Sequence, residues 1–162
     1  MLRFLAFLLL AGLAAPTPAP PQTVFVMRHL NTPAGAPDPD LLPEGQRRAA
    51  LLARWFRRGE RPVAIYVTDY RRTRQSAAPL AAALHLTPIV YNPADTPGLI
   101  ARVRAEHGNV LVIGHSNTVP DIVAALGGAR PEPLGHDDFG DIWRVAADGT
   151  TVRLGVDARP RQ

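Results

Sequence analysis

The chain contains no cysteine and no lysine. Without cysteine it has no disulfide, no thiolate metal site and no thiol nucleophile. All 18 basic residues are arginines, and they are scattered along the sequence rather than clustered, which argues against a nucleic-acid partner. The H-x-H and H-E-x-x-H patterns of zinc sites are also missing. We therefore expect neither a metal nor another cofactor.

Aromatic residues are few, at 6%, but apolar residues make up 46% of the 162 positions. That content and length suit one domain with a substantial hydrophobic core. The formal net charge is only +4.

Long apolar runs are confined to the amino terminus, where residues 4–15 follow Arg3. The run has the length of a signal-peptide core and is short for a membrane span. Ala14 and Ala15 suit a cleavage site, and prolines follow up to residue 21. We expect residues 1–21 to be a signal peptide and Pro-rich linker, residues 22–162 to be the domain, and the protein to be exported to the periplasm or secreted by a bacterium. The alternatives are an uncleaved anchor, which would be the only membrane contact, and an apolar helix packed on the domain.

The remainder alternates between strand-like and helix-like segments. Strands are predicted at 24–27, 63–67, 88–91, 110–113, 142–146 and 151–156, and helices at 43–58, 72–84, 97–107 and 118–126. Thr96 is the predicted N-cap of the third helix, and Asp148-Gly149 the predicted turn of a closing hairpin. The pattern predicts an α/β fold: a three-layer αβα sandwich with a mostly parallel sheet, helices on both faces and an antiparallel edge.

Polar residues stand where three of these strands end. Arg28 and His29 follow the first strand, residues 68–75 (T-D-Y-R-R-T-R-Q) follow the second, and His115 follows the fourth. Ligands of open α/β sheets bind at the carboxyl ends of the strands. Arginines and helix N-termini gathered there suit a dianion such as phosphate, and a neutral histidine beside it would be a nucleophile. On their own, Arg28 and His29 are equally compatible with a ligand site and with purely structural roles. In the structural case Arg28 would pair with a neighbouring carboxylate, and His29 would be a structural histidine.

These residues resemble the motifs of the histidine phosphatase superfamily, which has the phosphoglycerate mutase-like fold. The Arg28-His29 pair is similar to its first motif, residues 68–77 to S-D-L-x-R-T-x-Q-T-A, and residues 114–118 to its G-H-S motif. Residues 41–49 also follow the family pattern L-x-x-x-G-x-x-x-A. The resemblance covers residues 23–156 and points to a small, single-domain, exported branch.

The resemblance assigns roles position by position. It makes His29 the residue that is phosphorylated, Arg28 and Arg72 phosphate ligands, and His115 the second histidine, which hydrogen-bonds the transferred group. Three further residues are expected near the substrate, Thr32 and Asn31 beside the phosphate and Arg71 at the rim. His136 lies in a loop that would reach the mouth of the site.

Two departures from the family pattern bear on activity. Leu30 replaces the glycine that usually follows the nucleophilic histidine, so a different loop path is expected. The position after the second histidine, where acid-phosphatase relatives carry an aspartate, is Ser116. Asp95, in the loop after the third strand, is the candidate proton donor. Three other aspartates compete with it: Asp137, Asp138 and Asp141.

The resemblance implies a metal-independent phosphomonoesterase, acting through a phosphohistidine on His29 upon a phosphorylated small molecule or phosphoprotein. A non-catalytic phosphate-binding protein of the same fold is the main alternative, since Leu30 and the missing acid are both unusual. A metallohydrolase using His29, His115 and a carboxylate is disfavoured by the histidine spacing. A phosphoglycerate-type mutase is disfavoured by the expected export.

Overall fold

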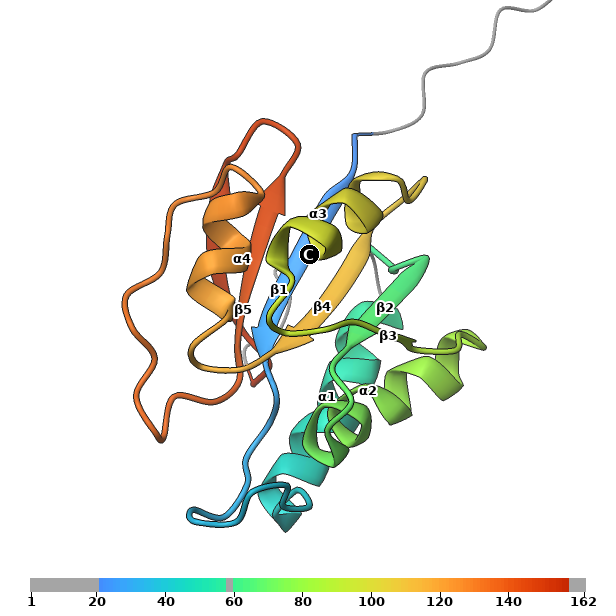
Figure 1. Cartoon of the computed structure of the whole chain (residues 1–162). Helices are drawn as coiled ribbons and strands as arrows, with labels where there is room; N and C mark the ends of the chain where they lie inside the picture. Colours follow the sequence, from blue (N-terminus) through green and yellow to red (C-terminus); the bar gives the residue numbers. More distant parts are fainter. Residues whose placement is uncertain (1–20, 58–59, 158–162) are drawn as a thin grey trace, which may run out of the picture.

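The architecture is that of a computed structural model, which describes residues 21–57 and 60–157 (Figure 1). The predicted signal peptide lies outside the described residues. One six-stranded sheet has the order β3-β2-β4-β1-β5-β6. Its strands are β1 (Thr23–Arg28), β2 (Ala64–Val67), β3 (Ile89–Val90), β4 (Val110–Gly114), β5 (Asp141–Ala146) and β6 (Thr151–Gly155).

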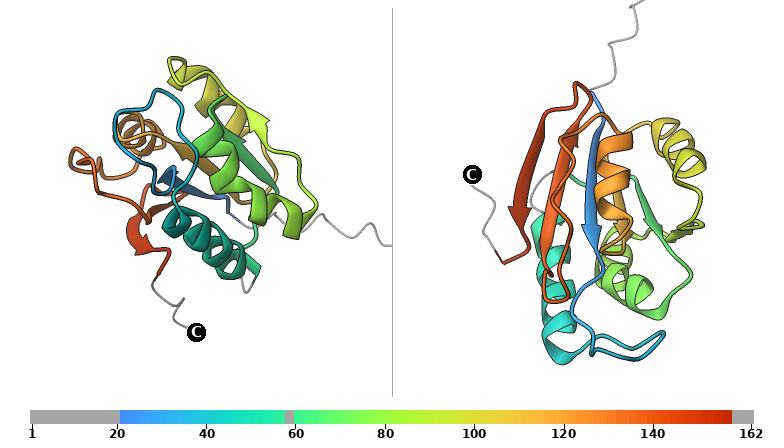
Figure 2. Two further views of the ribbon diagram at one scale, coloured as in Figure 1. Left: turned by 90° about the horizontal axis from the view of Figure 1, so that it is seen from below. Right: turned by 60° about the vertical axis from the view of Figure 1, so that its left-hand side comes forward.

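Four adjacent strands, from the edge strand β3 through β2 and β4 to β1, run parallel. The strand β4 pairs in parallel with β1 on one side and with β2 on the other, and β2 pairs in parallel with β3. The hairpin of β5 and β6 closes the edge, with β5 antiparallel to β1 (Figure 2). Its turn contains Gly149 with φ +85°, a backbone conformation that glycine adopts without strain. The predicted parallel sheet with an antiparallel edge is confirmed.

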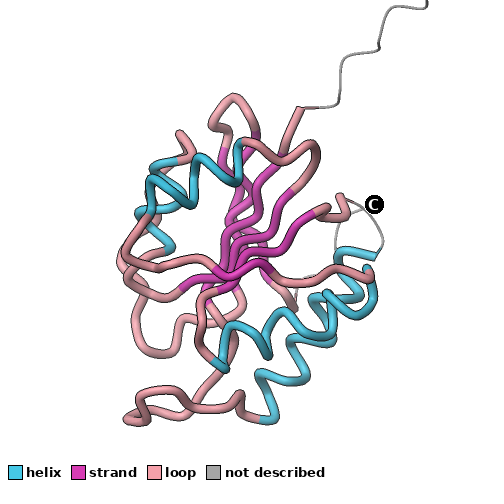
Figure 3. Tube along the Cα trace, turned by 45° about the vertical axis from the view of Figure 1, so that its right-hand side comes forward, coloured by secondary structure: helices cyan, strands magenta, loops and turns pink. Residues whose placement is uncertain are grey.

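Helices cover both faces of the sheet (Figure 3). They are α1 (Pro43–Arg57), α2 (Arg71–Leu84), α3 (Thr96–Arg104) and α4 (Val119–Ala125). Alternate residues of β1 explain the two layers, because side chains along a strand point to opposite faces. Phe25 and Met27 pack in the core beneath α1 and α2, whereas Val24 and Val26 pack in the core beneath α3 and α4. The predicted three-layer sandwich is confirmed.

The start of α3 differs from the prediction. The N-cap is Asp95 rather than Thr96, and its Oδ1 accepts a hydrogen bond from the backbone N–H of Gly98 at 2.9 Å. Aspartate and threonine are both good N-caps, so composition alone did not distinguish the adjacent positions. This difference also affects the candidate active site, because Asp95, the candidate proton donor, has its side chain engaged in capping the helix.

Leu30 is fully buried in the core with α1 and α2. Among the described residues other than glycine, only Glu60 and His85 have positive φ, so Leu30 keeps an ordinary backbone conformation. Its N–H donates to Ser76 Oγ on α2 at 2.9 Å. The side chain that replaces the family glycine therefore fills the core.

In the described part of the chain, no helix combines the length and the apolar character needed to cross a bilayer.

Candidate active site

The carboxyl ends of β1, β2 and β4 bring three distant segments to one edge of the sheet. In the register of β1 and β4, Arg28 lies opposite Gly114, and the N–H of His29 donates to the Gly114 carbonyl at 2.9 Å. His115 directly follows β4 and Thr68 directly follows β2. Parallel neighbours whose ends coincide thus place the two histidines side by side, with ring centroids 5.5 Å apart.

His29 is oriented by the backbone that follows it. Its Nδ1 lies 2.9 Å from the Leu30 carbonyl oxygen, which can only accept, so Nδ1 carries the proton and Nε2 keeps a lone pair. The pKa of His29 is lowered to about 3, mainly by burial and in smaller part by the charges of Arg28 and Arg72, against the opposing effect of the hydrogen bond to Leu30. At neutral pH the imidazole is therefore uncharged, as a nitrogen nucleophile requires.

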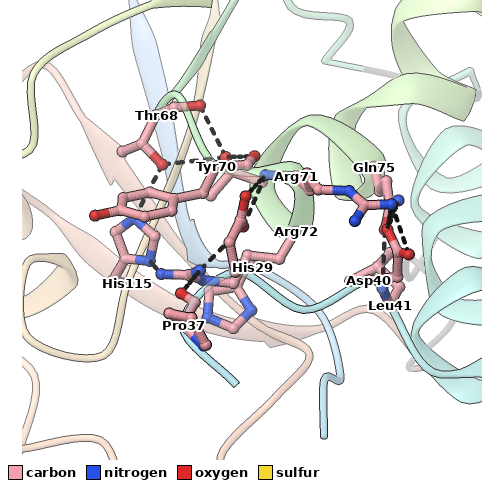
Figure 4. Close-up of polar contacts among 12 residues, drawn as sticks. His29, Pro37, Asp40, Leu41, Thr68, Tyr70, Arg71, Arg72, Gln75 and His115 are labelled. Atoms are coloured by element: carbon pink, nitrogen blue, oxygen red, sulfur yellow. Dashed lines mark hydrogen bonds and ion pairs between the residues drawn. The ribbon is translucent and has the colours of Figure 1, made fainter. Parts of the chain in front are cut away.

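His115 is held on both ring nitrogens. Its Nε2 lies 2.9 Å from Thr68 Oγ1, and its Nδ1 lies 3.4 Å from a terminal nitrogen of Arg72 (Figure 4). Burial lowers the pKa of His115 to about 4, and the two arginine charges contribute in the same direction. The Oγ1 of Thr118 accepts from the His115 N–H at 3.0 Å and fixes the loop that carries the ring.

Arg72 lies in the first turn of α2 and is held by hydrogen bonds to the loop before α1. Its guanidinium donates to the Pro37 carbonyl at 3.1 Å and to Asp38 Oδ1 at 3.3 Å. Its central carbon lies 4.1 Å from the ring centroid of Tyr70, a cation–π distance. These contacts hold the planar fork beside His115, where it can bind two oxygens of an anion.

Arg28 is turned toward the loop before β5. One of its terminal nitrogens donates to the carbonyls of Gly135 at 2.7 Å and His136 at 3.0 Å, and its guanidinium lies 4.0 Å from the ring centroid of Phe139. Its buried Nε has no hydrogen-bond partner. Arg28 therefore anchors this loop, and its charge still acts on both imidazoles.

A cavity of about 440 Å³ opens beside the two histidines. It is large enough for a phosphate with part of a substituent. The residues that line it are His29, Tyr70, Arg72, Pro93, Ala94, His115, Ser116, Asn117 and Thr118. Three of the four residues predicted to bind or carry phosphate thus share its wall, whereas Arg28, predicted as a phosphate ligand, does not line it.

The carboxylates proposed as proton donors are engaged elsewhere. Asp95 caps α3, and its loop presents Pro93 and Ala94 to the cavity instead. The other three interact locally: Asp137 with the His136 ring, Asp138 with the Gly135 N–H and Asp141 with Arg153. No carboxylate from the described ranges lines the cavity. Asp38 pairs with Arg72 and is thereby linked to the site, a contact that the sequence did not reveal because its loop has no regular pattern.

The remaining predicted site residues do not line the cavity either. Asn31 Oδ1 accepts from Arg48 at 3.0 Å, and Arg71 pairs with Asp40 at 2.7 Å. Thr32 is buried, and the His136 ring is exposed and pairs with Asp137 at 2.8 Å. In the described part of the chain, no group of three or more histidine and acidic side chains could hold a metal ion.

Two residues that sequence reasoning overlooked contribute to the site. Tyr70 stands where the second motif of the family has leucine, and it both lines the cavity and stacks on Arg72. Thr68 binds His115 and stands at the serine position of the same motif. A small hydroxyl residue directly after a buried strand, level with a histidine directly after the neighbouring strand, was the available signal.

Comparison with known proteins identifies relatives of both sequence and fold. The family model "Histidine phosphatase superfamily (branch 1)" matches residues 24–94. The protein histidine phosphatase SixA, solved in complex with tungstate, matches with a TM-score of 0.64 at 21% identity, over 83% of this chain and 97% of its own. The native mycobacterial glucosyl-3-phosphoglycerate phosphatase matches with a TM-score of 0.65 at 14% identity, over 85% of this chain and 99% of its own.

The complex of that mycobacterial enzyme with inorganic phosphate matches with a TM-score of 0.60 at 16% identity, covering 86% and 97% of the two chains. No curated protein sequence matches significantly. At these identities the solved structures establish the shared fold, and the family model adds a sequence match over β1, α1, β2, α2 and β3.

Proposed function

Since this chain has the fold of the histidine phosphatase superfamily and the sequence of its branch 1 over residues 24–94, we propose that it is a phosphatase that forms a phosphohistidine on His29. The observation that carries the proposal is the state of His29. It is a buried, neutral imidazole whose Nδ1 is committed to the Leu30 carbonyl, and it shares a cavity wall with Arg72 and His115. That is the arrangement of a nitrogen nucleophile beside an anion site.

The proposed reaction consists of two phosphoryl transfers. First, the Nε2 lone pair of His29 attacks phosphorus while the bond to the leaving atom breaks, and the leaving group departs with the bonding electrons. Arg72 and His115 bind the equatorial oxygens, on which charge accumulates in the transition state. Water then attacks the phosphohistidine, which releases inorganic phosphate and restores neutral His29. None of these steps needs a metal ion.

The lining of the cavity favours leaving groups that depart without a strong acid. Aryl phosphates and phosphohistidine have such leaving groups, whereas alkyl phosphates need protonation of a basic alkoxide. The similarity to the SixA fold supports a phosphohistidine-bearing protein within this class. The chain leaves little room for an inserted domain that would enclose the cavity, which favours a macromolecular or broad substrate over a tightly enclosed metabolite. A phosphorylated small molecule is the other substrate class.

The first test is hydrolysis of p-nitrophenyl phosphate, with and without a chelator. We expect phosphate release that is undiminished by the chelator and that falls at least about 10³-fold in His29→Ala, because the nucleophile is lost. His107→Ala is the matched control, since that exposed histidine lies near the opposite end of β4. Turnover that survives in His29→Ala would contradict the proposal.

The same assay on the wild type distinguishes an enzyme from a non-catalytic anion-binding protein. The absence of a lining carboxylate is the observation that favours the second possibility. Such a protein would bind inorganic phosphate through Arg72 and His115 and would release none from any substrate.

A panel of phosphosugars, phosphopeptides and phosphohistidine, run on wild type and Asp95→Ala, identifies the substrate class and tests whether Asp95 donates a proton.

We further propose that the protein is exported by its amino-terminal segment. The support is the apolar run at residues 4–15, with small residues at Ala14 and Ala15 and prolines after them. Mass spectrometry of the protein from the periplasm or medium of an expressing bacterium should show a mature chain beginning near residue 15 or 16. A full-length chain found only in the cytoplasm would contradict export.

A further inference from the structure

A buried chain of hydrogen bonds runs away from His115 beneath the cavity. The Nε2 of His115 lies 2.9 Å from Thr68 Oγ1, which lies 3.1 Å from Thr73 Oγ1. The Oγ1 of Thr73 lies 2.8 Å from the Tyr70 carbonyl and 3.0 Å from the Thr68 carbonyl. Thr68 and Thr73 are completely buried. Because water cannot reach these two hydroxyl groups, their hydrogen bonds must be made entirely within the protein.

The direction of this chain can be determined from its far end. The two carbonyls can only accept, so Thr73 donates its one hydroxyl proton to them and can only accept from Thr68. Thr68 then donates to Thr73, which leaves its oxygen to accept from His115. The Nε2 of His115 therefore carries a proton.

The other side of the His115 ring gives the same assignment independently. A terminal guanidinium nitrogen of Arg72, which can only donate, lies 3.4 Å from Nδ1. A proton on Nδ1 would point at this donor, whereas a lone pair can accept from it. Because a neutral imidazole has one N–H, both sides agree on a proton at Nε2 and a lone pair at Nδ1.

We infer that Thr68 and Thr73 are positioning residues that hold His115 with its proton on Nε2, and that one proton consequently accompanies each phosphate bound between Arg72 and His115. A lone pair facing a phosphate oxygen is repulsive, so the contact forms only when a proton lies between them. That proton is either brought on a phosphate monoanion or taken from solvent by Nδ1. This inference deepens the proposed function and rests on it for the location of the phosphate.

The charged and titratable groups around His115 agree with a neutral resting state. Those that face it are Arg72 and Tyr70 at the start of α2, His29 and Arg28 at the end of β1, and Asp38 in the loop before α1. Burial and the two arginines lower the pKa of His115, and only Asp38 opposes them. The imidazole thus enters the binding step without the proton that the contact requires.

The tautomer can be measured directly on the full-length protein by ¹⁵N NMR of the histidine rings, without phosphate and at neutral pH. We expect His115 to show a protonated Nε2 and an unprotonated Nδ1. Thr68→Val, which removes the acceptor, should give a mixture of tautomers, whereas Thr68→Ser should restore the wild-type pattern. Thr23→Val, a buried threonine at the start of β1, is the matched control. A protonated Nδ1 in the wild type would overturn the inference, even if no variant folds.

The binding of inorganic phosphate as a function of pH tests the proton count. Above the second pKa of phosphate, affinity of the wild type and of Thr68→Ser should fall by about tenfold per pH unit, as uptake of one proton requires. The fall should be shallower in Thr68→Val, because a neutral His115 with its proton on Nδ1 can donate to the dianion. Wild-type affinity that stays level or rises with pH would contradict the inference.

These measurements do not depend on turnover. A protein that binds phosphate but hydrolyses nothing would contradict the proposed function and leave the tautomer assignment standing. Conversely, an active enzyme with a protonated Nδ1 on His115 would retain the proposed function and lose this inference.

Discussion

At the scale of single residues, neighbouring arginines in the motif at residues 68–77 have different roles. Arg72 lines the cavity, with its guanidinium between Tyr70 and His115. Arg71 is exposed and pairs with Asp40, and Arg74 pairs with Asp69 on the surface. Exposed pairs of this kind contribute little to stability. All three arginines lie in the first turn of α2, so the face of the helix on which each side chain lies, rather than charge, separates the mostly buried Arg72 from its exposed neighbours.

Replacement of Arg72 tests this difference. We expect Arg72→Lys to lower kcat/KM for an aryl phosphate by about 10- to 100-fold, since an ammonium cannot replace the two-pronged hydrogen bonding of the fork. Arg74→Lys is the matched control and should change kcat/KM by less than about threefold, within the effect of an exposed ion pair. Steady-state kinetics on both variants measures this difference. An equal loss of kcat/KM in the two variants would show that Arg72 has no special contact with substrate.

At the scale of elements, the first turn of α1 approaches the loop after β1 very closely. A Cβ on Gly45 would lie 2.6 Å from the Asn31 carbonyl oxygen and 3.1 Å from the Asn31 nitrogen. The same loop is tied to α1 by a hydrogen bond from the Leu42 N–H to the Asn31 carbonyl at 2.9 Å. The glycine of the L-x-x-x-G-x-x-x-A pattern is thus explained by close packing beside the segment that carries His29.

Substitution of Gly45 has two opposing effects on stability. Alanine would favour the helix by about 1 kcal/mol, but the contact with a backbone oxygen cannot be relieved by a side-chain rotation. Overpacking of this kind costs about 1–3 kcal/mol, so we expect Gly45→Ala to lower the free energy of unfolding in urea. Arg54→Ala, at an exposed position of α1, should change it by less than about 0.5 kcal/mol. A stabilised Gly45→Ala variant would show that the loop moves freely.

The elements were largely predictable from the sequence, and the loops were not. The apolar run of β1 and the helical periodicity after Pro43 reflect local patterns, and strand ends in a parallel sheet coincide as a matter of geometry. His29, Arg72 and His115 could be placed at one edge for that reason. The orientation of Arg28 toward residues 135–139 could not be predicted, because it depends on an irregular loop more than 100 positions away. The role of Asp95 as a helix cap depended on a boundary shift of one residue.

At the scale of the whole molecule, the two buried imidazoles make folding sensitive to acid. The pKa is lowered to about 3 for His29 and to about 4 for His115, with burial as the main cause in both. The unfolded chain binds protons at these positions below about pH 6.5, and the folded chain does not. Stability contributed by the neutral rings is therefore complete above that pH and is lost as the pH falls toward the folded pKa values.

This linkage predicts a specific difference between wild type and His29→Gln. The free energy of unfolding, measured in urea at pH 7.5, 6 and 5, should fall less steeply with acid in the variant, because the variant has one titrating ring fewer. Between pH 7.5 and 8.5, where neither state takes up protons at these rings, the two should change in parallel. Parallel behaviour down to pH 5 would mean that His29 is protonated in the folded protein.

The most direct test of the central claim is isolation of the covalent intermediate. Rapid denaturation of the enzyme during turnover of a ³²P-labelled aryl phosphate should trap label that survives alkali and is lost in acid, as a phosphorus–nitrogen bond requires. Peptide mapping should place that label on His29, and His29→Ala should carry none. Label on another residue, or phosphate release by wild type with no label trapped even in the first turnover, would contradict the account.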